Sequence, residues 1–86
     1  MAKKVVYGDH ASEKFALLRR HGFVVSRKQV TETVQRPEKV EDGYKGRKVA
    51  QRSITERHVL RVIYEDGPEE MRIVTFYPGR KSRYED

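Results

Sequence analysis

The chain has 86 residues, of which 36% are hydrophobic and 37% charged, and its formal net charge is +6 at pH 7. That length gives room for one core, so we expect a single domain over residues 1–86. The absence of cysteine excludes disulfides, thiolate zinc sites and thiol nucleophiles. No apolar run approaches the roughly 20 residues that span a bilayer, and the first residues lack the hydrophobic stretch of a signal peptide. We therefore expect a cytoplasmic protein with no membrane partner.

The first elements predicted along the chain are a short strand over 3–7 and a helix over 10–21. Asp9 is the expected N-cap of this helix, and Gly22 stands where a left-handed residue commonly ends one. The apolar residues of the helix recur at the spacing of one buried face. They are Ala11, Phe15, Leu18 and, widening the stripe, Leu17.

A second helix is predicted by a sharper start signal. Ser26 and Gln29 have the spacing of a capping box, in which each side chain satisfies a free backbone N–H of the first turn. Val25 and Val30 flank this box with the spacing of a hydrophobic staple. Pro37 ends the helix.

The rest of the chain changes to the period of strands. The predicted strands are 38–41, 47–55, 58–65 and 71–77, and residues 79–86 are expected to form a basic C-terminal tail. In the last strand, alternation puts Val74 and Phe76 on the face opposite to Ile73, Thr75 and Tyr77. The order of elements predicts an α+β fold, with two N-terminal helices packed on one face of a small antiparallel sheet.

Positive charge is concentrated in two segments. Residues 1–36 carry eight basic and three acidic residues, and residues 44–64 carry six basic residues and one acidic residue. An acidic stretch over 37–43 separates the two segments, and another over 65–78 follows the second. Two such segments can form a basic face that suits nucleic acid, or a solvated surface rich in salt bridges.

No familiar catalytic signature or metal-ligand spacing is present, and the three histidines are scattered. We therefore expect neither a metal nor another cofactor. RNA cleavage by the neighbouring 2′-hydroxyl fits the residue types available, because histidine, tyrosine, lysine and arginine supply a base, an acid and cations. His10 is the best general base by position, since the first turn of a helix favours the neutral imidazole that a base needs. Covering the helix end is its alternative role.

Arg61 lies in a predicted strand between two apolar neighbours on the same face, where a charge is costly unless it is paired or used. It either clamps a phosphate or pairs with a glutamate across the sheet. The last ten residues interleave cations with tyrosines, a pattern that suits backbone contact and base stacking but also a frayed terminus. Within them, Tyr77 and Arg80 are the residues for which a functional role is favoured.

Six segments of the chain resemble an uncharacterised prokaryotic family, number 4258 of the domains of unknown function, which is related to the RelE/ParE toxins. These segments are Asp9–Lys14, Arg20–Phe23, Val30–Pro37, Gly46–Gln51, His58–Tyr64 and Ile73–Pro78. The resemblance implies a RelE-like fold. Its His-Ala and Thr-x-Tyr positions correspond to His10-Ala11 and to Thr75 and Tyr77. Lys14 stands where the family usually has arginine, and it keeps the charge without the bidentate geometry.

The leading interpretation is a toxin of a type II toxin–antitoxin pair, a metal-independent endoribonuclease acting on messenger RNA, with or without the ribosome. Its partners would be a cognate antitoxin and RNA or the ribosome. The alternatives are a non-catalytic module that binds nucleic acid or the ribosome, and a protein-interaction module of the gyrase-poisoning type. The predicted catalytic residues are His10, Arg61, Tyr77 and Arg80. The predicted nucleic-acid-binding residues are Lys14, Arg47, Arg52, Thr75, Lys81, Arg83 and Tyr84.

Overall fold

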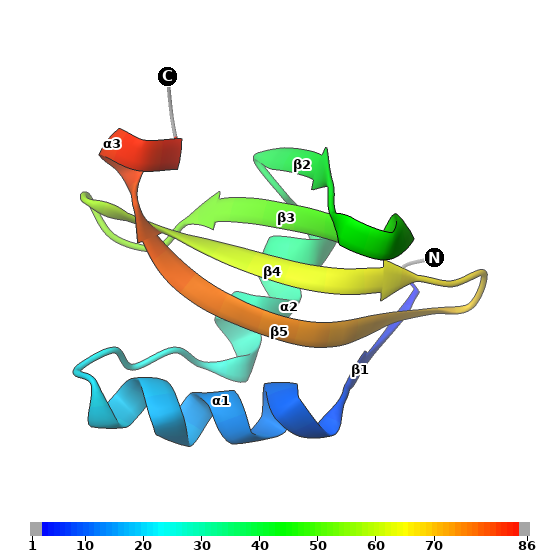
Figure 1. Ribbon diagram of the computed structural model, residues 1–86, viewed down its shortest axis with the longest axis horizontal. Coiled ribbons are helices and arrows are strands. Elements are labelled where there is room, and N and C mark those ends of the chain that lie inside the picture. The colour runs from blue at the N-terminus through cyan, green and yellow to red at the C-terminus, as the bar shows by residue number, and fades with distance from the viewer. Residues whose placement is uncertain (1–2, 85–86) are drawn as a thin grey trace.

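The computed structural model describes residues 3–84, which form one five-stranded sheet and three α-helices (Figure 1). The predicted α+β class is confirmed. The elements, in chain order, are β1 Lys4–Tyr7, α1 Asp9–Arg20, α2 Arg27–Gln35, β2 Lys39–Asp42, a 3₁₀ turn Tyr44–Gly46, β3 Lys48–Ser53, β4 His58–Asp66, β5 Glu70–Arg80 and α3 Lys81–Tyr84.

The sheet has the strand order β1-β5-β4-β3-β2. Strands β2 to β5 form an antiparallel meander, as predicted. The first strand, β1, instead pairs with β5 in parallel, with Lys4 opposite Glu70 and Tyr7 opposite Ile73. The prediction of an antiparallel sheet was therefore wrong, and the sheet is mixed. The parallel pairing joins the two ends of the chain, so no local turn signal announces it.

The core lies between the sheet and the helices α1 and α2. In Figure 1, α2 crosses one face of the sheet and α1 runs along β5. Fully buried members include Ala11, Val30, Leu60, Val62 and Phe76. Burying each of the larger aliphatic or aromatic side chains is worth roughly 1.5–3 kcal/mol, so this layer is the main source of stability.

Two apolar residues were assigned to the wrong surroundings by simple periodicity. Leu17 does not widen the core stripe, because 44% of it is exposed. Ile73 is fully buried in the core with Phe76, although alternation puts them on opposite faces. The cause is a bulge: Ile63 pairs with Thr75 and Tyr64 with Ile73, so Val74 has no partner and the alternation restarts.

The helix ends follow the sequence in part. The capping box of α2 is present, since Ser26 Oγ accepts a hydrogen bond from Gln29 N and Gln29 Oε1 accepts one from Ser26 N. Gly22 has φ +88°, as expected for a left-handed residue after α1. Asp9 is not the N-cap of α1. Gly8 takes that position, and Asp9 lies in the first turn, where its negative charge interacts favourably with the positive end of the helix dipole.

The C-terminal part is more regular than the predicted tail. Gly79 and Arg80 continue β5 and pair with Val59 and His58 of β4. Residues 81–84 then form α3, while the last two positions of the predicted tail, 85–86, lie outside the described residues. Among the helices of residues 3–84, none is long and apolar enough to cross a membrane.

Candidate functional site

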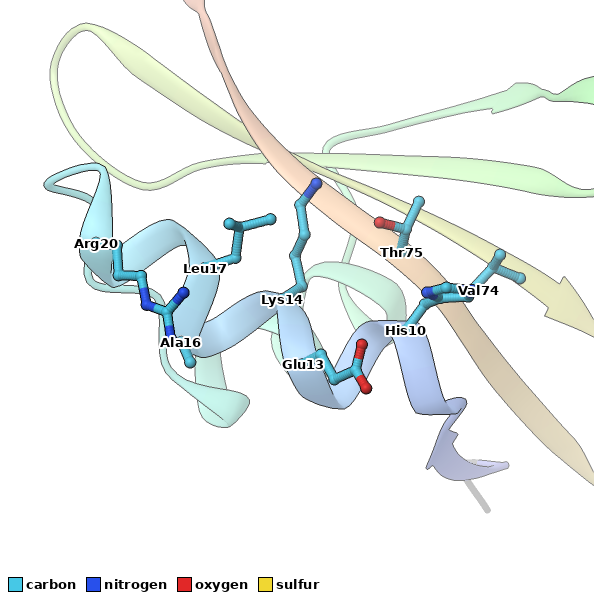
Figure 2. Close-up of a pocket in the computed structure, with 8 residues that line it drawn as sticks. All are labelled: His10, Glu13, Lys14, Ala16, Leu17, Arg20, Val74 and Thr75. Carbon is cyan, nitrogen blue, oxygen red and sulfur yellow. The ribbon is translucent and has the colours of Figure 1, made fainter.

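A groove of about 660 Å³ lies between α1 and β5. His10, Lys14, Leu17 and Arg20 line it from α1, and Val74 and Thr75 from β5 (Figure 2). In Figure 2, the Lys14 side chain extends from the helix toward the strand that carries Thr75. Three residues singled out from the sequence, His10, Lys14 and Thr75, thus meet in one concavity, although Thr75 is 61 positions away from Lys14.

Helical spacing explains the α1 wall of this groove. Its residues recur every three or four positions from His10 to Arg20, which places them on one face beside the buried stripe. The strand wall exists because β1 pairs with β5 only as far as Ile73. Beyond this point Val74, which the bulge leaves without a partner on β4, lines the groove together with Thr75.

The basic side chains of the groove have no salt bridge or side-chain hydrogen bond within the described part of the chain. Within residues 3–84, the side chains of His10, Lys14 and Arg20 form neither a salt bridge nor a hydrogen bond with another side chain. Glu13 is the one acidic residue that lines the groove, among the residues described. One imidazole, two cations and the Thr75 hydroxyl therefore face a concave surface that can receive an anion.

Arg61 and Tyr77 form a separate cluster on the face of the sheet opposite to the core. Arg61 Nε donates to Tyr77 Oη at 3.0 Å, and Arg61 Nη1 donates to Gln51 Oε1 and to Glu41 Oε1, the latter at 3.3 Å. The hydrogen bond from Arg61, followed by one from Lys39, lowers the pKa of Glu41 below its ordinary value. Arg61 is only 8% exposed, and its Nε and Nη1 are hydrogen-bonded inside the protein.

The ring of Tyr84 covers this cluster. The Arg61 guanidinium lies 4.3 Å from the centre of the Tyr84 ring, and the Tyr77 ring lies 6.5 Å from it. Gly79 makes this possible, because a Cβ at that position would collide with the Tyr84 ring. Tyr84 thus helps to dock the C-terminal helix α3 on the sheet.

The remaining predicted residues are spread over the surface. Arg80 and Lys81 line a second pocket, of about 400 Å³, together with Arg57 and His58. Arg52 donates to the Arg36 carbonyl at 2.8 Å. Two others have local partners: Arg47 lies 3.5 Å from Glu65, and Arg83 lies 5.9 Å from the Tyr84 ring.

The four predicted catalytic residues therefore lie in three places. His10 lines the groove beside α1, Arg61 and Tyr77 are joined on the sheet face opposite to the core, and Arg80 lines the pocket at the end of β5. Sequence reasoning missed Arg20, although its helical spacing from His10 was a usable signal. It also missed Arg57 and His58, for which no signal existed, since the strand register alone brings them to Arg80.

Within the described part of the chain, no three His, Asp or Glu side chains are grouped as they would be to hold a metal ion. Comparisons of the sequence and the structure with protein-family models, with curated proteins and with solved structures find no match.

Proposed function

We propose that this protein is the toxin of a type II toxin–antitoxin pair and cleaves messenger RNA without a metal. The observation that carries the proposal is the convergence of His10, Lys14 and Thr75 on one groove. The order of elements and the α+β class are consistent with the RelE-like fold and with the family that the sequence resembles. In this proposal the partners are RNA, alone or on the ribosome, and a cognate antitoxin, and the protein acts in the cytoplasm.

The groove has groups for each step of cleavage by the 2′-hydroxyl. His10 accepts the proton of the 2′-hydroxyl, whose oxygen forms a bond to phosphorus while the bond from phosphorus to the 5′-oxygen breaks. The leaving 5′-oxygen takes up a proton, for which Lys14 is our candidate donor. The products are a 2′,3′-cyclic phosphate and a 5′-hydroxyl. Thr75 and the ammonium group of Lys14 stabilise the charge that builds up on the phosphate oxygens in between. Arg20 lies ten residues, or about 15 Å, from His10 along α1, so it does not contact the same phosphate.

The proposal revises the roles that the sequence suggested for two residues. Arg61 uses its donors on Tyr77, Gln51 and Glu41, so we assign it to the structure of the sheet rather than to the phosphate. Tyr77 binds Arg61 through its hydroxyl, so we assign it to the same structural cluster rather than to the catalytic residues.

The test is induced expression of the wild-type chain and of His10→Ala in a bacterial host, with growth followed and new RNA 5′ ends mapped. His21→Ala is the matched control, because His21 is an exposed histidine at the end of the same helix and does not line the groove. We expect arrest and new 5′ ends with the wild type and His21→Ala, and neither with His10→Ala. Purified variants with unchanged circular dichroism exclude unfolding as the cause.

Two other results would contradict the proposal and indicate which alternative holds. Arrest without new RNA ends indicates a protein target such as gyrase. RNA binding without arrest or cleavage indicates a non-catalytic binding module, a function favoured by the internal hydrogen bonds that Arg61 Nε and Nη1 make in place of contacts with a phosphate.

A further inference from the structure

The second basic pocket of the molecule lies where the β3–β4 connection meets the end of β5. Its cations are Arg57, Arg80 and Lys81, and His58, the first residue of β4, also lines it. The register pairs His58 with Arg80, and Lys81 N donates to the Arg57 carbonyl at 2.9 Å. These backbone contacts bring the β3–β4 connection, which carries Arg57, to the end of β5 and the start of α3, although Arg57 and Arg80 are 23 positions apart.

The lining of this pocket carries a net positive charge. Among residues 3–84, none of Arg57, Arg80 and Lys81 forms a salt bridge. Glu56 lines the pocket, and Glu38 is close enough for Lys81 to contribute to lowering the pKa of its carboxyl. The lining therefore holds three cations and one acid, Glu56, while Glu38 lies outside it. The resulting net positive charge attracts anions.

His58 is held in a defined orientation at the wall of this pocket. Its Nδ1 lies 3.2 Å from Thr55 Oγ1, and its ring meets the Phe23 ring edge-on at 5.3 Å. Phe23 belongs to the connection that follows α1, three residues after Arg20. The Phe23–His58 contact therefore links the segment that follows α1 to β4 beside the pocket, and in Figure 1 the C-terminal end of α1 and the β3–β4 connection both lie on the left.

We propose that this pocket is a second phosphate-binding site for a single RNA strand whose reacting phosphate lies in the α1 groove. Thr75 and Arg80 mark the two sites on the same strand, five residues or about 17 Å apart. A strand of a few nucleotides bridges that distance, and a single-stranded chain gains affinity from every phosphate that it places against a cation. Arg80 then anchors the substrate and does not take part in the chemistry. The inference rests on the proposed function for the identity of its ligand, RNA.

The test measures binding rather than cleavage. The probes are oligouridylates of two to twelve nucleotides in which every ribose is 2′-O-methylated, so that no 2′-hydroxyl attack is possible. The variant is Arg57→Gln with Arg80→Gln, and the matched control is Lys28→Gln with Arg72→Gln, which removes the same charge from exposed positions outside both sites. Thermal melting of each purified variant checks the fold, and Lys81→Gln provides a second, milder variant.

For the wild type we expect the affinity to rise stepwise at the length that first spans both sites. The double variant should lose this step and bind the longest probe about tenfold more weakly, with the dinucleotide unaffected. The slope of log affinity against log salt should also fall by roughly 0.7 for each phosphate that the double variant no longer neutralises. The control variant should keep the step.

Three results would overturn the inference: no step in the wild type, an unchanged step in the double variant, or an equally weakened affinity in the control. Competition by oligoglutamate that depends on Arg57 and Arg80, without any effect of these residues on RNA, would assign the pocket to an acidic peptide instead. A stepwise profile in a protein that cleaves nothing would contradict the proposed function alone. Cleavage with an unchanged length profile in the double variant would contradict this inference alone.

Discussion

Arg61 illustrates what one buried charge does in this fold. Its guanidinium is surrounded by Tyr77, Gln51 and Glu41 and covered by the ring of Tyr84. A buried cation with several internal partners holds neighbouring strands in register. Removing it leaves the partners, and above all the 3%-exposed Gln51, without a donor in a site that water reaches poorly.

We predict that Arg61→Met lowers the free energy of unfolding by about 2–4 kcal/mol, because one side of a buried polar network is removed. Urea denaturation followed by circular dichroism measures this. Arg52→Met is the matched control, since Arg52 makes one hydrogen bond at the protein surface, and its effect should stay below about 1 kcal/mol. An Arg61→Met protein as stable as the wild type would return Arg61 to the phosphate-binding role.

The sequence alone could not choose between the two roles of Arg61. Its apolar neighbours showed that the charge is costly, which limits the answer to a partner or a ligand. The partner Glu41 is 20 positions away and is brought to it by β2 pairing with β3, and β3 with β4. Register across three strands is a property of the whole sheet, and no local pattern encodes it.

At the scale of elements, α2 is the one whose start was best predicted. Ser26 and Gln29 satisfy each other's backbone donors, and Val25 and Val30 are both buried in the core. The signal is reliable because all four residues lie within six positions and the physics is local. The parallel pairing of β1 and the bulge at Val74 were missed for the opposite reason, since both depend on strands that meet only in the folded sheet.

We predict that Ser26→Ala destabilises the protein by about 1 kcal/mol, because the N–H of Gln29 loses its acceptor at the start of α2. The thermal midpoint and the urea midpoint both report the change. Ser12→Ala, in the exposed part of α1, should leave stability unchanged or raise it slightly, since alanine is the better helix former. Equal destabilisation in the two variants would show that the capping box does not set the stability of α2.

At the scale of the whole molecule, the carboxyl groups with lowered pKa values gather, among the residues described, at one edge of the sheet. Three carboxyl groups in and beside β2 have lowered pKa values: Glu38, Glu41 and Asp42. The N–H and hydroxyl of Ser53 donate to Glu38 at 2.8 and 3.0 Å, and the backbone bond is the largest cause of its shift. Hydrogen bonds from Arg61 and from Lys48 are the largest causes for Glu41 and Asp42. Each contact ties β2 or its approach to β3 or β4.

The sign of the resulting pH dependence follows from the direction of the shifts. A carboxyl whose pKa is lower in the folded than in the unfolded chain adds stability above its unfolded pKa, and this stability is lost as the pH falls through the folded value. We therefore expect the free energy of unfolding to fall below about pH 4, with β2 separating from β3 first. Urea denaturation at pH 7, 5 and 3 measures the decrease, and amide exchange of β2 against β4 locates it.

The triple variant Glu38→Gln, Glu41→Gln, Asp42→Asn should be less stable than the wild type at pH 7 and approach it at pH 3. A second triple variant, Glu56→Gln, Glu69→Gln, Glu70→Gln, removes the same charge away from β2 and should keep the wild-type pH dependence. If both triple variants flatten the profile equally, the acid sensitivity comes from overall charge repulsion and not from the β2 contacts.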